Sequence, residues 1–484
     1  QLAGLPAPAG EAAGALSRAE RVAAGWSYSE MGYSYLDMGN AQVALGYFER
    51  ARQAGQVEGE GRLDAAGLMH LGVAYAQLGE VQRAINCYEQ TLAIFRAIGD
   101  RRGEGSALGN LGGTYLRMGD ARRAIGCFEQ ALAIRREIGD RRGEGTDLGN
   151  LGSAYFQLGE VRRAIGYYEQ ALAIARAIGD RRGEGNHLTG LGTSHSQLGD
   201  ARRAIGYYEQ ALAIARAIGD RSGEGNDLMG LGNAYLQMGD ARRAIGYYEQ
   251  GLAIDREIGD RMGEGKALGN LGNAYAHVGD VRRAIGYYEQ ALAIAREIGD
   301  GGGEGNRLGN LGEAYRRLGD LQRAIGYFEQ ALAIAREIGD ANGVASHSFN
   351  MALLYTQQGN QAASLPLARE AARLWTQMGH AAYAQRAQQL VQELEGGRQP
   401  GAGPTPAEIL DQFGAVIPAA VAAARGDRSA RSQIESAFDR LTQNGWQIAE
   451  PIRRLWAGER DAARLTAGLD ESDSLIVREI LKHL

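Results

Sequence analysis

The sequence predicts an all-α protein: a solenoid of stacked helical hairpins followed by a small helical domain. A Leu-Gly-Asp tripeptide or close variant recurs every 40 residues, and apolar residues within each block follow helical spacing. The chain has 484 residues, more than one core usually organises, and 72 of them are glycine against only 8 prolines. That composition excludes collagen and favours an array of repeats. The tripeptide glycines are Gly39, Gly79, Gly119, Gly159, Gly199, Gly239, Gly279 and Gly319, with a degenerate copy at Gly359.

Block 141–180 shows why each repeat is expected to form two helices. Asp140 suits an N-cap, and Gly159 suits a left-handed C-cap. The apolar stripe of the first helix is Leu148, Leu151, Tyr155 and Leu158. The stripe of the second helix is Ala164, Tyr168, Ala171 and Ala175, and Gly179 ends it. A single hairpin cannot bury both apolar faces, so neighbouring blocks must stack.

A stripe of glycines runs along the first helix of each block. Gly145, Gly149 and Gly152 lie at i, i+4 and i+7, although each glycine costs about 1 kcal/mol relative to alanine in a helix. A bare stripe permits close approach, either by a neighbouring helix or by a bound chain. We expect Gly152 to pack against a helix and Gly149 to lie at a surface. Other blocks replace Gly149 with Thr189, Met229 and Phe349.

The repeat resembles the tetratricopeptide repeat, in its long 40-residue form. The residues that carry the resemblance in the third block are Leu108, Leu111, Gly112, Tyr115, Ala124, Phe128 and Ala131. The long form is similar to Pins-type adaptors, kinesin light chains and bacterial multidomain proteins. The resemblance covers residues 25–395 and implies a right-handed superhelix of about nine hairpins, closed by a capping helix at 381–395. Residues 1–24 are expected to be a partly helical segment.

The resemblance also implies a concave groove, lined by the first helix of each hairpin, that holds an extended or helical peptide. The asparagines at the matching positions are Asn110, Asn150, Asn233, Asn270, Asn273, Asn310 and Asn350. A carboxamide both donates and accepts, so such a ladder would suit a peptide backbone. The alternative is that these asparagines bond across adjacent helices and orient the stack. The neighbours expected to give specificity are Phe156 and Leu116, then Gln157, Gln197 and Gln237, and finally Arg316 and Arg317. Their order suggests a ligand with an apolar part and an acidic part.

Several function classes are not expected. The net charge is −6, and the recurrent arginine pairs alternate with glutamates, so they indicate a solvated mixed-charge face and no nucleic-acid or membrane surface. The nearest phosphate-loop candidate, residues 263–267, lacks the Ser or Thr that should follow Lys266. The seven histidines show no metal-ligand spacing, and Cys87 and Cys127 form no CxxC pair. We therefore expect no catalysis, no cofactor and no metal.

Cellular context follows from the same composition. Two unpaired cysteines suit a reducing compartment, so a cytoplasmic protein is expected. The scarcity of lysine, with only two in the chain, is typical of a GC-rich bacterial genome.

The repeat ends before the C-terminal part of the chain. Residues 396–406 form a Gly- and Pro-rich linker, and residues 407–484 predict a domain of four or five short helices. Its expected core is Trp446, Ile448, Ile452, Leu455 and Trp456. This domain is interpreted either as a contact for a second partner or as a structural cap.

Two functions from different classes remain open at this point. The first is a non-catalytic scaffold that binds a peptide segment of a partner protein in the groove. The second is the ligand-sensing arm of a larger bacterial NTPase- or protease-coupled signalling or defence switch. Self-assembly through the ends of the array is a third possibility.

Overall fold

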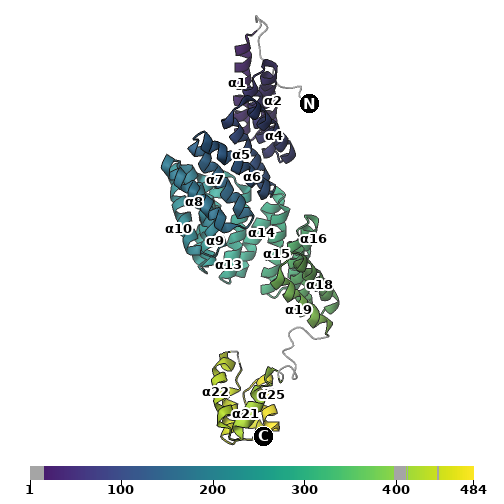
Figure 1. The fold of residues 1–484 in the computed structure, drawn as a ribbon. Coiled ribbons are helices and arrows are strands. Elements are labelled where there is room, and N and C mark those ends of the chain that lie inside the picture. Colours follow the sequence, from purple (N-terminus) through teal and green to yellow (C-terminus); the bar gives the residue numbers. More distant parts are fainter. Residues whose placement is uncertain (1–15, 397–409, 411, 444–445) are drawn as a thin grey trace. The chain divides into compact units, whose positions relative to one another are not determined.

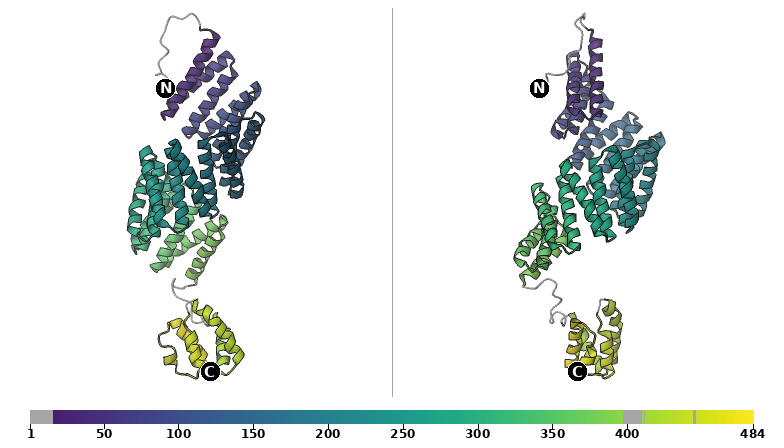
Figure 2. Two further views of the ribbon diagram at one scale, coloured as in Figure 1. Left: turned by 90° about the vertical axis from the view of Figure 1, so that its left-hand side faces the viewer. Right: turned by 180° about the vertical axis from the view of Figure 1, so that it is seen from behind.

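The computed structural model describes residues 16–396, 410, 412–443 and 446–484. The chain divides into two compact units, Gln1–Ile338 and Gly339–Leu484. The described residues form helices and no strands, which confirms the all-α prediction. In the first unit consecutive helices pair into hairpins that stack in chain order (Figures 1 and 2). These helices are α1 (Arg18–Asp37), α2 (Ala41–Glu58), α3 (Gly61–Gln77), α4 (Val81–Ile98), α5 (Arg101–Arg117), α6 (Ala121–Glu137), α7 (Arg141–Gln157), α8 (Val161–Ile178), α9 (Arg181–Gln197), α10 (Ala201–Ile218), α11 (Arg221–Gln237), α12 (Ala241–Ile258), α13 (Arg261–His277), α14 (Val281–Ile298), α15 (Gly301–Arg317) and α16 (Leu321–Glu337).

Glycine and aspartate set the helix boundaries. Every twentieth residue from Gly39 to Gly379 is a glycine with φ between 67° and 86°, a conformation that favours residues without a Cβ. Aspartates then cap the next helix; the Asp140 carboxylate, for example, accepts the Gly143 N–H at 3.0 Å. Both features were expected from the sequence.

Gly152 packs against a helix, as predicted. A Cβ at this position would lie 2.8 Å from the ring of Tyr168, which belongs to the second helix of the same hairpin. The equivalent Gly232 is tighter still, with a hypothetical Cβ 2.3 Å from the ring of Tyr248. Glycine therefore makes room for a buried aromatic ring in each hairpin core.

The expectation that Gly149 lies at a surface is wrong. Gly149 is buried, and a Cβ there would lie 2.5 Å from the imidazole of His187 in the following hairpin. The residue at this position varies because its counterpart in the next hairpin varies in size. Gly269 faces the larger Arg307, while Thr189 faces Asp227 and donates a hydrogen bond to it at 2.6 Å.

Met229 lies at the same repeat position, on α11, and its size is also compensated by a neighbour. It packs against a cluster that includes Ala267, and its sulfur lies 3.2 Å from where a Cβ of Gly251 would be. Most other blocks have alanine in place of Gly251, with Thr91 as the exception, so in this hairpin the extra volume of methionine is balanced by a lost methyl group.

In five successive blocks a buried glutamate joins the block to the one before it. Glu184, 8% exposed, accepts hydrogen bonds from Arg176 Nε at 2.9 Å and Arg181 Nη1 at 2.6 Å. The same double contact recurs at Glu104, Glu144, Glu224 and Glu264. Glu304 keeps its contact with Arg296, but Gly301 stands where the second arginine would be.

We expect Glu184→Gln to lower the free energy of unfolding by about 1–2 kcal/mol, because two charge-assisted hydrogen bonds are weakened. Solvent around the half-exposed arginines limits the loss. Glu304→Gln is the matched control and should cost less, since Glu304 has one arginine partner in place of two. Urea unfolding followed by circular dichroism measures both. Equal losses in the two variants would contradict the double contact.

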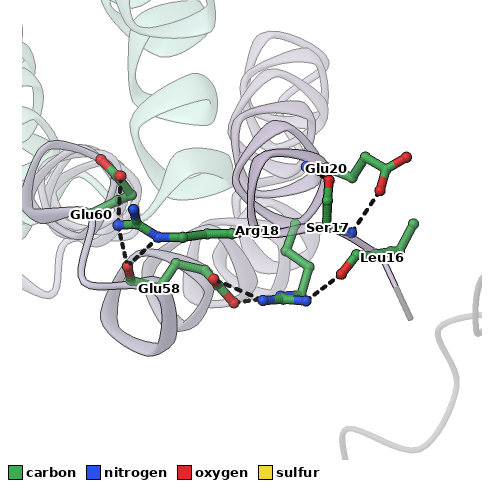
Figure 3. Close-up of polar contacts among 7 residues, drawn as sticks. Leu16, Ser17, Arg18, Glu20, Glu58 and Glu60 are labelled. Carbon is green, nitrogen blue, oxygen red and sulfur yellow. Dashed lines mark hydrogen bonds and ion pairs between the residues drawn. The ribbon is translucent and has the colours of Figure 1, made fainter. Parts of the chain in front are cut away.

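The first hairpin is held by a polar cluster at the start of α1 (Figure 3). Ser17 and Glu20 form a capping box. Arg18 donates to the Glu58 carbonyl oxygen at 2.7 Å and to Glu60 Oε1 at 2.9 Å, and Arg21 donates to the Glu58 carboxylate at 2.6 Å. The beginning of α1 is thus tied to the turn between α2 and α3.

The second unit holds one further hairpin and its capping helix. These are α17 (Ala341–Gln357), α18 (Gln361–Gln377) and α19 (Ala381–Glu395). The bounds of α19 match the predicted capping helix, and it buries Ala384, Ala387 and Leu390. The predicted linker lies almost entirely outside the described residues, as does most of the predicted N-terminal segment.

The C-terminal part of the second unit contains five described helices with a core of their own. They are α21 (Val416–Ala424), α22 (Arg428–Gln443), α23 (Ala449–Trp456), α24 (Ala462–Leu465) and α25 (Glu471–Lys482). Ile448, Ile452 and Leu455 are fully buried, and Trp446 and Trp456 pack against them, which confirms the predicted core. Within the described part of the chain, no helix is long and apolar enough to span a membrane.

Candidate functional site

Three of the predicted groove residues line one pocket in the first unit. The pocket has a volume of about 380 Å³ and lies among α11, α13, α14 and α15. Asn273, Asn310 and Arg317 line it together with Glu313 and Tyr288. Its apolar lining consists of Leu236, Ala276, Val281 and Ala314. First helices of three successive hairpins therefore contribute to one cavity.

The asparagines around this pocket bond to one another across hairpins. Asn310 Nδ2 donates to Asn273 Oδ1 at 3.4 Å, and Asn270 Nδ2 donates to Asn233 Oδ1 at the same distance. Each accepting oxygen also receives a tyrosine hydroxyl, that of Tyr288 on Asn273 at 2.8 Å. Hydrogen bonds of this kind, between neighbouring hairpins, are what we expect if the asparagines orient the stack. The amide nitrogens of Asn233 and Asn273 donate to no group in the described residues, so each keeps two N–H groups for a ligand.

The glutamines and the phenylalanine expected to give specificity have different surroundings. Gln237 Nε2 donates to the Ser196 carbonyl oxygen at 3.1 Å, and the Ser196 hydroxyl donates to Gln237 Oε1 at 3.3 Å. Gln157 and Gln197 are exposed. Phe156 is half-buried and packs at the edge of the core. Phe156 thus offers part of its ring to solvent, and Gln237 mainly joins two hairpins.

The two predicted acid-binding arginines are already neutralised in part. Arg316 donates twice to the Glu313 carboxylate at 2.7 Å, and Arg317 donates to it at 3.0 Å. Arg317 also donates to the Ala276 carbonyl oxygen at 3.3 Å. One carboxylate therefore serves both arginines, and the pair offers one net positive charge.

A second pocket lies between α7, α8 and α9 and has a volume of about 290 Å³. Asn150 and Asn186 line it, together with His187 from the inter-hairpin contact described above. Burial lowers the pKa of His187, so its imidazole is neutral at pH 7. Asn110 is half-buried in the first unit, and Asn350 is half-buried in the second.

Sequence reasoning missed a set of tyrosine partners beneath these positions. The hydroxyls of Tyr168, Tyr208, Tyr248 and Tyr288 bond to Ser153, Thr193, Asn233 and Asn273, at 2.7–3.0 Å. In blocks with phenylalanine at the tyrosine position, Phe128 and Phe328, the partner position holds Gly113 and Glu313. This co-occurrence of a hydroxyl with a small polar partner was visible in four of the aligned repeats but not in the second, where Val73 holds the partner position of Tyr88. It indicates that Asn233 and Asn273 have a structural role in addition to any role in binding.

The titratable groups give no sign of a metal or redox centre in the described part of the chain. No three His, Cys, Asp or Glu side chains there are grouped so as to hold a metal ion. Cys87 and Cys127 are free and buried, and burial raises the pKa of both thiols, which keeps them protonated at pH 7.

Paired helices in 40-residue blocks, with polar first helices lining pockets, define a helical-repeat protein of the class that binds other chains. The chain belongs to the tetratricopeptide repeat family. The family model matches eight overlapping segments: 23–97, 63–137, 103–177, 145–217, 183–257, 226–297, 264–337 and 304–377.

One solved structure shows the same fold at low sequence identity, and two others are similar over part of this chain. One is a signal transduction ATPase with numerous domains that has a tetratricopeptide repeat sensor, from Pyrococcus horikoshii, with 17% identity and a TM-score of 0.58. The match covers 77% of this chain and 55% of that one, so this chain corresponds to about half of the ATPase. Another is BtubC from P. vanneervenii, with 24% identity over 45% of this chain and 92% of that chain and a TM-score of 0.41. A Rap protein complexed with competence and sporulation factor has 15% identity over 69% of this chain and 97% of that chain, with a TM-score of 0.45. No curated protein sequence matches.

Proposed function

We propose that the protein is a non-catalytic scaffold that binds a peptide segment of a partner protein along the first helices of its hairpins. The observation that carries the proposal is the 380 Å³ pocket, where side chains from three successive hairpins converge. Membership of the tetratricopeptide repeat family supports a protein-interaction role.

The chemistry of the pocket suits an extended peptide. The free amide N–H groups of Asn273, in the pocket, and of Asn233, at the equivalent place in the hairpin before it, match backbone carbonyls, which every peptide offers regardless of its sequence. The two asparagines are 40 residues apart in the chain and hold the same place in successive hairpins, so they form a short ladder. The apolar lining provides room for one side chain of the ligand.

The test begins with a pull-down from the native host, followed by calorimetric titration of the recovered partner segment. We expect the double variant Asn273→Ala, Asn310→Ala to weaken binding at least about tenfold, since several hydrogen bonds to the ligand are lost. The matched control is Gln290→Ala, Gln330→Ala, whose amides bond within their own helices. Unchanged affinity in the asparagine variant, with a native circular dichroism spectrum, would exclude this pocket as the binding site.

A second candidate function is the sensor portion of a larger signalling switch. It is favoured by the likeness to the Pyrococcus ATPase, whose repeats are described as a sensor. The reading frame that flanks Gln1 discriminates the two candidates. An NTPase or protease module encoded there would support the switch, and a start codon adjacent to Gln1 would count against it.

A further inference from the structure

Arg307 is a half-buried arginine without an ion-pair partner. It belongs to α15, and its guanidinium lies over Gly269 of α13, where a Cβ would be 2.3 Å from Cζ. Within the described residues the guanidinium makes no hydrogen bond and no ion pair. The electrostatic influence of Asp300 reaches it, but the Asp300 carboxylate caps α15 by accepting the Gly303 N–H at 2.8 Å.

Two other arginines of the first unit have acidic partners. Arg135, 11% exposed, donates to Asp140 at 3.0 Å and to Ser106 at 3.1 Å. Arg317 has Glu313, as described above. A buried charge is costly unless it is paired, and a guanidinium stays charged at any physiological pH. Arg307 therefore carries a half-buried positive charge that no ion pair compensates.

The position of Arg307 links it to the proposed peptide pocket. Tyr288, which lines the pocket, lies within electrostatic reach of both Arg307 and Arg317. Gly269, beneath the guanidinium, is one helical turn from Asn273 on α13. A segment that contacts Asn273 would therefore pass within reach of Arg307.

We propose that Arg307 recognises a carboxylate of the bound segment and is the acid-specificity residue of this groove. The inference rests on the proposed function. The carboxylate is either an Asp or Glu side chain or the C-terminus of the segment, because both present the same two oxygens to the planar guanidinium fork. Gly269 leaves the space in which the fork lies flat against α13. Arg316 and Arg317 share the Glu313 carboxylate, whereas Arg307 has no ion-pair partner, so an incoming anion is expected to bind Arg307 more strongly.

The test uses four fluorescein-labelled peptides of ten residues and identical length, titrated by fluorescence anisotropy at low salt. They contain either two glutamates or two glutamines, and each form is made with a free or an amidated C-terminus. We expect the wild-type protein to bind at least one carboxylate-bearing peptide about tenfold or more tightly than the glutamine amide, a preference of about 1.4 kcal/mol. The glutamate peptide with an amidated C-terminus and the glutamine peptide with a free C-terminus distinguish side-chain from C-terminal recognition.

Arg307→Gln should abolish this preference while leaving the affinity for the glutamine amide unchanged. Arg282→Gln is the matched control, because Arg282 is exposed and the change in net charge is the same. Arg307→Lys should restore the preference only in part, since an ammonium lacks the bidentate fork. A preference that survives in Arg307→Gln, or that falls equally in Arg282→Gln, overturns the inference.

The outcomes also separate this inference from the proposed function. Loss of preference in Arg307→Gln with no effect of Asn273→Ala, Asn310→Ala supports Arg307 and contradicts the asparagine pocket. The reverse pattern supports the pocket and overturns the role of Arg307. If no peptide binds the wild-type protein at millimolar concentration, both fail.

Thermal unfolding without ligand gives an independent readout. Arg307→Met should melt at the same or a higher temperature than the wild type, because an unpaired half-buried charge is removed. A marked fall in melting temperature would show that the guanidinium stabilises the fold, and would contradict the unpaired state.

Discussion

Replacing Gly232 with alanine should destabilise the array by about 3 kcal/mol, whereas replacing Gly246 with alanine should stabilise it by about 1 kcal/mol. Both glycines lie inside helices of the same hairpin, α11 and α12. A Cβ at Gly232 would lie 2.3 Å from the ring of the fully buried Tyr248, so the ring or the helix must shift. A Cβ at Gly246 meets nothing within 4 Å, so only the helix propensity of alanine remains.

Chemical denaturation of the two variants beside the wild type measures this difference. Tyr248 donates its hydroxyl to Asn233, so Gly232→Ala is also expected to disturb this hydrogen bond. The double variant Gly232→Ala, Tyr248→Ala opens space for the new methyl group and is the control for the overpacking. Stabilisation by Gly232→Ala alone would contradict the packing of the ring against this helix.

Two buried carboxyl groups, Asp147 and Asp227, should each lower the stability of the array as pH rises from about 4 to 7. Burial raises the pKa of Asp147 to about 7, against the opposing influence of Arg135, and the pKa of Asp227 is likewise raised to about 7. Asp147 is 3% exposed, its Oδ2 accepts no hydrogen bond, and Arg135 Nε is 3.7 Å away. Neither carboxylate is well compensated when ionised.

The sign follows from proton linkage. Below pH 3.8, the ordinary aspartate value, both carboxyls are protonated in the folded and the unfolded chain, so these two groups do not change the free energy of unfolding. Between pH 3.8 and 7 the unfolded chain releases its protons first, so the free energy of unfolding falls by up to about 1.4 kcal/mol per pH unit for each residue. Above about pH 7 both states are ionised and the loss is complete.

Asp147→Asn should therefore be more stable than the wild type at pH 8, by about 2–4 kcal/mol, and of similar stability at pH 4. Urea unfolding at both pH values measures the effect, and Asp37→Asn, at an exposed site, is the control. Equal stabilisation of Asp147→Asn at pH 4 and pH 8 would show that the carboxyl is not ionised at the higher pH in the folded protein.

The repeat, the helix ends and the hairpin core were predictable from sequence. Gly179 ends its helix in the left-handed conformation and Asp180 caps the next, because both effects act within a few residues of the chain. The placement of Gly152 against an aromatic residue was also within reach, since Tyr168 lies on the adjoining helix of the same block.

Contacts between blocks were harder to predict. Gly149 was expected at a surface because its position varies, and the variation is in fact matched by His187, Asp227 and Arg307 in the following hairpins. The two members of each pair are 38 residues apart in the chain, so no local periodicity links them. The neutralisation of Arg316 and Arg317 is a different case, because Glu313 lies three and four residues before them on the same helix and its pairing with them was predictable from the sequence.

The sequence by itself determined that this chain is a tetratricopeptide repeat array with two helices per 40-residue block, because helix formation, capping and apolar periodicity are local properties. The tertiary structure alone decided which polar groups are free. Tyrosine hydroxyls occupy the side-chain oxygens of Asn233 and Asn273, and Arg307 is left unpaired. Whether a charge or an amide is satisfied depends on the side chains that neighbouring helices bring within about 3 Å, and that is fixed only when the hairpins stack.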